Sequence, residues 1–255
     1  MTRPSIAVAG SLLLAGLLTA PALPQSSLPA RSSYPIPKTL TLNHATLPIW
    51  IDASVAVTAN GEPNPAIWGE YTGRITELLQ KTASGGCREV GPVFEETPMP
   101  PPRATLDDAV THSDVALLGR VTDKAYGFYS GAPGQLIQVE PERSFGRRLD
   151  KARYYFFVPV ARFQIGSVEL CKTDPRYAEP PDVGGEVFLF VLPPADPTGT
   201  LLHVLNPGDI VPVGAGGDLR LPAQYAGGQE KSAAAQTKAG LLAAIEAKRG
   251  KGVQP

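Results

Sequence analysis

The sequence predicts a mainly β fold with added helices, in which short antiparallel strands form a small barrel or sandwich. The first observation is the segment 153–165, RYYFFVPVARFQI, where apolar side chains alternate with a period of two. The second is the number of turn-forming residues, because 26 glycines and 27 prolines among 255 residues favour short strands over long helices. The third is the succession of apolar runs and turn signals along residues 114–221.

Segment 153–165 is predicted to be the central strand of the core. One face carries an unbroken apolar row: Tyr155, Phe157, Ala161, Phe163 and Ile165. Pro159 cannot donate a ladder hydrogen bond, so it marks an edge position or a bulge. A bulge would exchange the two rows there and place Tyr154, Phe156 and Val158 inside together with Ala161 and Phe163.

The first 22 residues have the features of a secretory signal peptide. Arg3 supplies the positive start, and the apolar run 6–18 is too short to span a bilayer comfortably. Ala20-Pro21-Ala22 offers a cleavage site of small residues, with an uncleaved anchor as the alternative. We therefore expect a secreted or periplasmic protein without an integral membrane span after cleavage.

The two cysteines, Cys87 and Cys171, are expected to form a disulfide, because export would place them in an oxidising compartment. The bond would tie the first third of the chain to the β core and close a long loop. The alternative is a pair of unrelated thiols. Two distant cysteines without neighbouring histidines give little support to a metal site, and we predict no metal and no other cofactor.

The segment before the core contains an amphipathic helix. Asn64 followed by Pro65 is typical of a helix start, and Gly85-Gly86 is typical of a helix end. Apolar residues recur between them on one helical face: Ile67, Tyr71, Ile75, Leu78 and Leu79. A stiff proline-rich spacer, residues 98–102, follows and marks the best domain boundary.

Beyond the spacer, Thr105 is predicted to cap a short helical turn, with Asp107 and Asp108 at its positive end. Further strands are predicted at residues 114–123, 135–139, 168–172, 186–192, 201–205, 210–213 and 219–221, and a helix at 232–249. The predicted units are a signal peptide (1–22), an N-terminal segment with the amphipathic helix (23–103), a β-barrel domain (104–226), and a C-terminal helix and tail (227–255).

Three stretches together resemble a set of bacterial exported domains: SDVALLGRV after a short acidic helical turn, YYFFVPVARFQIG, and GEVFLF at residues 185–190. Such domains are similar to the OB-like barrel of tissue inhibitors of metalloproteinases and netrin modules. The resemblance covers roughly residues 106–205 and implies an OB-like barrel without an assigned activity. The chain lacks the inhibitors' dense disulfides and their cysteine at the mature N-terminus, so no inhibitory residue is carried over.

Two stretches are candidate binding sites. Residues 125–134, AYGFYSGAPG, are predicted to form a loop in which Tyr126, Phe128 and Tyr129 bind carbohydrate, peptide or a protein surface by stacking. The alternative is that these rings fold back over the open end of the barrel. Residues 143–153 are predicted to form a basic loop, whose Arg147, Arg148 and Lys151 would meet an anionic partner. The alternative is a solvated loop balanced by its acidic residues: Glu140, Glu142 and Asp150.

Catalytic patterns are sparse. His112 lies near Asp107, Asp108 and Asp114, which suggests acid–base or metal chemistry, although these aspartates also suit a helix start. His203 is predicted on the solvated side of a strand. The formal net charge of -1 provides no field that would attract nucleic acid or an anionic membrane.

The sequence therefore predicts an exported, non-catalytic module that binds an unknown protein or carbohydrate in the envelope or outside the cell, and that binds no nucleic acid. Two alternatives stay open. One is a secreted hydrolase that uses His112 with Asp107 or Asp114, and the other is a structural component of the envelope.

Overall fold

The computed structural model describes residues 40–42, 45–47, 50–80, 87–90, 105–129, 132–165, 168–174, 176–177, 181–194, 199–221, 225 and 236–252. For residues 40–42, 45–47, 52, 54 and 163–165 the description covers the backbone alone. All of these residues belong to one compact unit, Tyr34–Pro255. The predicted signal peptide (1–22) and the spacer 98–102 lie outside the described residues.

The described chain is mainly β, which confirms the predicted class. Its strands are β1 (Leu40–Leu42), β2 (Ala45–Leu47), β3 (Trp50–Asp52), β4 (Arg88–Glu89), β5 (Val115–Tyr129), β6 (Ala132–Gly146), β7 (Tyr154–Val158), β8 (Ala161–Ile165), β9 (Val168–Lys172), β10 (Glu186–Val191), β11 (Leu201–Leu202) and β12 (Ile210–Val213). Its helices are η1 (Ala53–Ala56), α1 (Pro65–Trp68), η2 (Gly69–Tyr71), α2 (Thr72–Gln80), α3 (Leu106–His112), η4 (Pro207–Asp209) and α5 (Lys238–Arg249).

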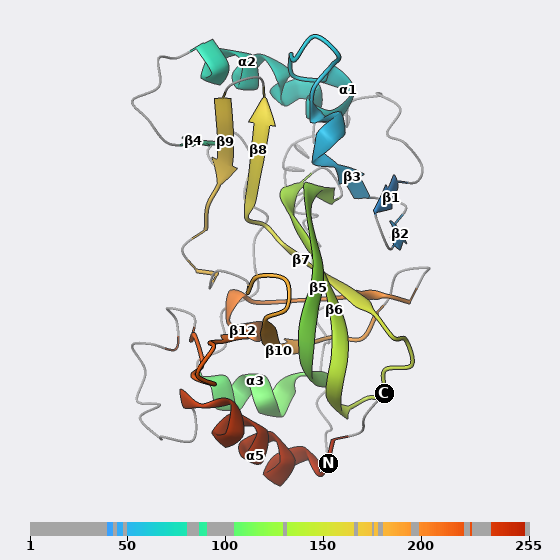
Figure 1. The fold of residues 1–255 in the computed structure, drawn as a ribbon, viewed down its shortest axis with the longest axis vertical. Helices are drawn as coiled ribbons and strands as arrows, with labels where there is room; N and C mark the ends of the chain where they lie inside the picture. Colours follow the sequence, from blue (N-terminus) through green and yellow to red (C-terminus); the bar gives the residue numbers. More distant parts are fainter. Residues whose placement is uncertain are drawn as a thin grey trace, which may run out of the picture. The chain divides into compact units, whose positions relative to one another are not determined.

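The hairpin of β5 and β6 is the centre of the main sheet, and its two strands run side by side in Figure 1. The strand order is β11-β7-β6-β5-β10-β12, and β3 pairs with the far end of β5. Every pairing is antiparallel except that of β11 with β7. Within the described residues the sheets are open, so the expected closure into an OB-like barrel is not confirmed.

The hairpin extends through most of the segment that was predicted to be a loop. Residues 125–129 belong to β5 and residues 132–134 to β6, so only the tip at 130–131 lies outside the described strands. The register shifts at Leu118/Gly119 and at Val121/Asp123. The first shift is a bulge, and the strands approach closely there, because a Cβ at Gly119 would collide with Val139 Cγ2.

The predicted single strand 153–165 is divided at Pro159, and this corrects its assignment as the central strand. β7 belongs to the main sheet, whereas β8 pairs with β9 in a second sheet of order β4-β9-β8. The row that the bulge alternative placed inside is buried: Tyr154, Phe156 and Val158. Ala161 is buried in a different cluster, and the side chains of Phe163 and Ile165 lie outside the description. Pro159 therefore marks a crossing between sheets.

The second sheet packs against the segment that precedes the spacer. Asn64 caps α1 through its Oδ1, which accepts a hydrogen bond from the Ala66 N–H at 3.1 Å, as predicted. The predicted helix is interrupted at Gly69, whose φ of 54° is unfavourable for residues with a Cβ, and it continues as α2. Ile75 of α2 is fully buried in one cluster with Trp68, Ala161 and Leu170.

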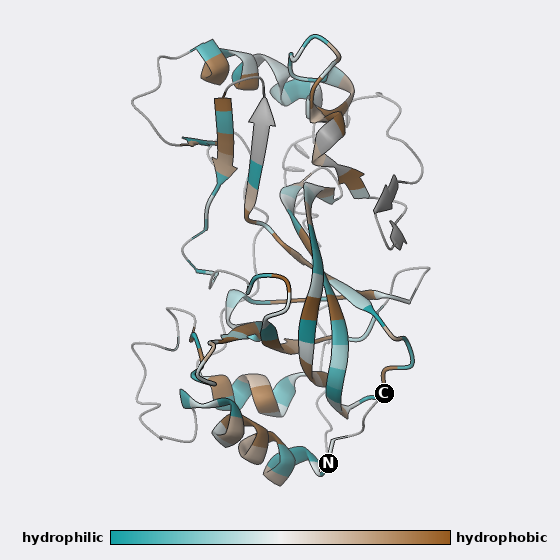
Figure 2. Cartoon of the chain, in the orientation of Figure 1, coloured by the Kyte–Doolittle hydropathy of each residue, from teal (hydrophilic) through white to brown (hydrophobic). Residues whose placement is uncertain are grey.

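One face of the main sheet is covered by two helices. α3 contributes Leu106, Ala109 and Val110, and α5 contributes Leu241 and Ile245, to one buried cluster with Phe188 and Phe190 of β10. Figure 2 shows hydrophobic residues on both helices. Val187, Leu189 and Val191 face the opposite cluster, so β10 is covered on both sides, as its apolar sequence predicts. The predicted cap at Thr105 forms as a capping box with Asp108, and α5 begins at Lys238, later than the predicted helix 232–249, with Thr237 as its cap.

Candidate functional site

Phe128 is in the hydrophobic core, and this corrects its assignment as a binding residue. Its ring is 1% exposed and packs edge-on against Trp68, with the two ring centroids 5.0 Å apart. Trp68 in turn donates a hydrogen bond from Nε1 to the Ala56 carbonyl at 2.8 Å. A ligand could reach the Phe128 ring only if this cluster opened, so the ring holds the hairpin against the N-terminal segment.

The glycines of the predicted loop provide room for aromatic rings from neighbouring strands. Gly127 and Gly134 face each other across the hairpin. A Cβ at Gly127 would lie 2.6 Å from the Trp50 ring, and a Cβ at Gly134 would collide with the Phe157 ring. Tyr129 packs against Phe157 with a centroid separation of 5.3 Å and is half-buried. Most of the predicted aromatic site is therefore internal packing.

Tyr126 is the most accessible of the three predicted aromatics, with 37% of its surface exposed. Its neighbour two residues earlier, Lys124, forms an ion pair with Asp182 at 3.3 Å. Val183, which follows Asp182, is 60% exposed. Tyr126 thus remains a surface residue, but the structure does not bring it together with Phe128 and Tyr129 as one exposed aromatic surface.

Replacing Phe128 and Tyr126 separately with alanine is expected to give very different losses of stability. Phe128→Ala removes a buried ring and should lower the free energy of unfolding by about 3–5 kcal/mol. Tyr126→Ala should change it by less than about 1 kcal/mol because the ring is partly solvated. Urea denaturation of both variants measures the difference, and similar losses would contradict the burial of Phe128.

The second predicted site lies after β6. We call residues 147–153 the basic loop, since Arg143 to Gly146 belong to the strand itself. Leu149 is 3% exposed and anchors the loop in the main core. At the start of the loop, the Arg147 N–H donates a hydrogen bond to the Asp114 carbonyl at 3.2 Å. The preceding Gly146 has a φ of 90°, which sets the direction in which the chain leaves the strand.

Tyr154 fixes the middle of the basic loop. Its hydroxyl accepts hydrogen bonds from the Asp150 N–H at 2.8 Å and the Lys151 N–H at 2.9 Å, and it donates to Asp150 Oδ1 at 3.3 Å. Burial raises the pKa of Tyr154, while the two backbone donors act in the opposite direction. The phenol therefore stays protonated and keeps this geometry at neutral pH.

Four cationic side chains of the basic loop are exposed: Arg147, Arg148, Lys151 and Arg153. In the part of the chain that the structure describes, none of them forms an ion pair. Glu142, which was considered as a balancing charge, instead pairs with Arg120 across the hairpin at 2.6 Å. Asp150 is the one acidic residue of the loop, so the loop itself carries a formal charge of about +3.

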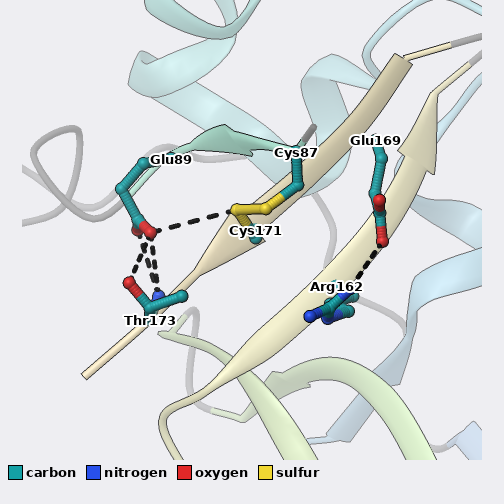
Figure 3. Close-up of a disulfide and its surroundings, with 6 residues drawn as sticks. All are labelled: Cys87, Glu89, Arg162, Glu169, Cys171 and Thr173. Atoms are coloured by element: carbon teal, nitrogen blue, oxygen red, sulfur yellow. Dashed lines mark hydrogen bonds and ion pairs between the residues drawn. A yellow bond between two sulfur atoms is a disulfide. The ribbon is translucent and has the colours of Figure 1, made fainter. Parts of the chain in front are cut away.

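The predicted disulfide between Cys87 and Cys171 is present, and it joins the residue before β4 to β9 over a sequence separation of 84 residues. Figure 3 shows its surroundings, in which the Glu89 carboxylate accepts hydrogen bonds from the Thr173 N–H at 3.1 Å and from Thr173 Oγ1 at 2.6 Å. Parallel pairing of Glu89 with Cys171 completes the link. This pairing brings a segment from before the spacer into the second sheet.

The geometry around His112 is that of a helix end. The ring is exposed, and its Nδ1 lies 3.0 Å from the Asp108 carbonyl oxygen. Asp108 completes the cap with the Thr105 N–H at 3.1 Å, and Asp107 pairs with Lys248 of α5. Among the described residues there is no group of three or more His, Cys, Asp or Glu side chains that could hold a metal ion. His203, predicted on a solvated row, is half-buried beside Leu192, and its Nε2 is buried.

Sequence reasoning missed two residues of the basic loop's structure. Arg153 ended the predicted basic loop and began the predicted strand, but it was not named among the binding cations, although its charge adds to the exposed set. Tyr154 was considered only for its place in the strand. The sequence gives only a weak signal that its hydroxyl also forms hydrogen bonds with the loop backbone. A tyrosine that ends a polar loop and enters a buried strand can carry its hydroxyl back to the loop backbone.

Comparisons with known proteins found no match: no protein-family model, no curated protein and no solved structure matches the chain. None of the described helices combines the length and apolar character that crossing a membrane requires. The candidate site is therefore defined by its own geometry, as a cationic loop whose backbone is fixed by Leu149 and Tyr154.

Proposed function

We propose that the chain is an exported, non-catalytic module that binds an anionic ligand through the basic loop. The observation that carries this proposal is the loop itself, which displays four exposed cations on a backbone held by Tyr154, Leu149 and Asp114. A loop that is ordered before binding loses less conformational entropy when a ligand arrives. Arginine, which supplies three of the four cations, offers a planar donor pair that matches carboxylate, sulfate and phosphate groups.

The exported location is supported by the disulfide. A disulfide that closes so long a stretch of chain is expected in an oxidising compartment and is rare in the cytoplasm. Cleavage of the predicted signal peptide, residues 1–22, and release to the periplasm or the exterior are part of the proposal.

The non-catalytic role is supported by what two of the acidic residues near His112, Asp107 and Asp108, already do. Asp107 is engaged with Lys248, and Asp108 with the Thr105 cap. The Asp107 contact holds α3 to α5, and the Asp108 contact caps the first turn of α3. Each contact would be lost if its carboxylate turned to orient a catalytic imidazole. The basic loop has no such structural ion pairs among the described residues, so its charges are available to a partner.

Neutralising two cations of the basic loop is expected to weaken binding of a sulfated polymer. Dextran sulfate serves as the probe, and its dissociation constant is measured by calorimetry at low and at physiological salt. Arg147→Gln with Arg148→Gln should raise the dissociation constant roughly tenfold, since each exposed contact contributes about 0.5–1 kcal/mol. Salt should weaken the wild-type interaction further because it screens exposed charges.

The matched control is the pair Arg74→Gln with Arg220→Gln, which changes the net charge equally at two other exposed arginines. Circular dichroism establishes that both double variants are folded. Equal weakening by the two pairs would mean that net charge alone attracts the polymer, and an unchanged dissociation constant in the first pair would remove the basic loop from the proposal.

A further inference from the structure

The end of β6 brings two basic segments together that lie about one hundred residues apart in sequence. A Cβ at Gly252 would lie 2.5 Å from the Phe145 ring, and a Cβ at Gly146 would lie 3.0 Å from Arg249 Nη1. The end of α5 and the residues that follow it therefore contact the strand end from which the basic loop starts. The sequence contains no local sign of this contact.

Lys248 and Arg249 attach the end of α5 to α3, which lies beside it in Figure 1. Lys248 contacts Asp107, and it donates a hydrogen bond to Thr111 Oγ1 at 3.1 Å. Arg249 donates to the Val110 carbonyl at 2.5 Å and to Ser113 Oγ at 2.8 Å. These bonds place the chain after α5 at a fixed position, so the location of the next residues follows from the fold.

Lys251 is the next cation along the chain. Its side chain is exposed, and no ion pair that the structure describes includes it. Because Gly252 contacts Phe145, Lys251 lies at the same strand end as Arg147 and Arg148. The chain around Lys251 and the basic loop therefore meet at the same end of β6, although they belong to two distant segments.

We propose that Lys251 joins Arg147 and Arg148 in one binding surface for an anionic polysaccharide, a polymer that carries sulfate, carboxylate or phosphate groups. This inference rests on the proposed function and names its ligand class and a further binding residue. Cations from two segments would contact successive charged groups along the polymer, and the contacts add because the fold holds both segments in place.

The composition of the surface favours a polysaccharide over a lipid bilayer. Among the described residues of this region, the large apolar side chains of Phe145 and Leu149 are each 3% exposed and cannot insert into a membrane. Exposed acidic residues, Asp114 and Asp150, lie among the cations. A uniformly anionic bilayer would repel these carboxylates, whereas a polymer with spaced charges can pass between them.

The inference is tested on the full-length mature chain with its disulfide intact. Lys251→Gln is expected to raise the dissociation constant for dextran sulfate about threefold, and Lys251→Arg should retain wild-type binding. Arg74→Gln is the matched control, because it removes one exposed charge elsewhere and should change the constant less than about twofold. Neutral dextran should not bind. Vesicles of phosphatidylcholine and phosphatidylglycerol test the bilayer as an alternative ligand.

The outcomes separate this inference from the proposed function. If the pair Arg147→Gln and Arg148→Gln weakens binding while Lys251→Gln does not, the two-segment surface is wrong and the proposed function stands. If the vesicles bind and dextran sulfate does not, the polysaccharide is wrong while an anionic ligand stands. If neither the arginine pair nor Lys251→Gln has an effect, both proposals fail. If the arginine pair and Lys251→Gln each weaken binding of dextran sulfate, and the vesicles do not bind, the inference and the proposed function are both supported.

Discussion

Removing the disulfide between Cys87 and Cys171 is expected to lower the free energy of unfolding by about 4 kcal/mol. The bond joins residues that are 84 positions apart, and a cross-link over a loop of this length removes a corresponding amount of entropy from the unfolded chain. The native structure depends on it locally as well. β4 has two residues and pairs with β9 alone among the described strands, so the disulfide reinforces a short stretch of pairing that the Glu89–Thr173 hydrogen bonds also support.

The variant Cys87→Ser with Cys171→Ser is compared with the wild type in urea, with and without a reductant. Both tryptophans, Trp50 and Trp68, are buried and report unfolding by fluorescence. The reductant should lower the wild-type midpoint toward that of the double variant and should leave the double variant unchanged. Equal midpoints for the oxidised wild type and the double variant would contradict a stabilising role.

Loss of protection against hydrogen exchange should begin at Val90, whose N–H donates a hydrogen bond to the Cys171 carbonyl at 2.7 Å. This measurement distinguishes a local opening of β4 from destabilisation of the whole unit, because amides of β5 and β6 would exchange early only in the second case.

The sequence was sufficient to predict features that depend on neighbouring residues. The caps at Asn64 and Thr105 form because their side chains reach backbone N–H groups two or three residues ahead. The burial of β10 on both faces follows from its uninterrupted apolar residues. The exposure of Arg147 and Arg148 also followed from their charge, since unpaired charges are rarely buried.

Features that depend on contacts between distant residues could not be predicted from local sequence patterns. The alternation in segment 153–165 identified strands correctly, but it could not show that Pro159 separates two sheets. Phe128 is buried because it packs against Trp68, which lies 60 positions earlier in the sequence. The residues after α5 reach the end of β6 through the packing of Gly252 on Phe145. A candidate site assembled from separate segments leaves no local pattern, because its residues become neighbours only in the folded chain.

The role of Gly127 and Gly134 could not be predicted from the local sequence either, because glycine in a polar stretch is also typical of a turn. In the structure they form a cross-strand pair that admits a ring from each flanking strand, Trp50 from β3 and Phe157 from β7. The two rings pack edge-on, with centroids 6.5 Å apart. A side chain at either glycine would occupy the space of a ring that the core already uses.

Gly127→Ala and Gly134→Ala are therefore each expected to lower the free energy of unfolding by about 3 kcal/mol, the upper part of the range for overpacking. In an unobstructed strand, alanine would instead be the more favourable residue. Gly73→Ala is the matched control, because Gly73 lies inside α2 and a Cβ added there would meet no atom within 4 Å. That change should raise stability by about 0.5–1 kcal/mol.

A second substitution distinguishes obstruction by a side-chain ring from obstruction by the backbone. At Gly134 the nearest atoms belong to the Phe157 ring, with the Val158 carbonyl oxygen at 2.6 Å, so Phe157→Ala should recover part of the loss. At Gly127 the nearest atom is the Ile51 carbonyl oxygen, which no side-chain substitution removes, so Trp50→Ala should recover less. Urea denaturation of both double-mutant cycles measures the coupling. Additive losses in the cycle of Gly134 and Phe157 would show that the Phe157 ring does not occupy this space.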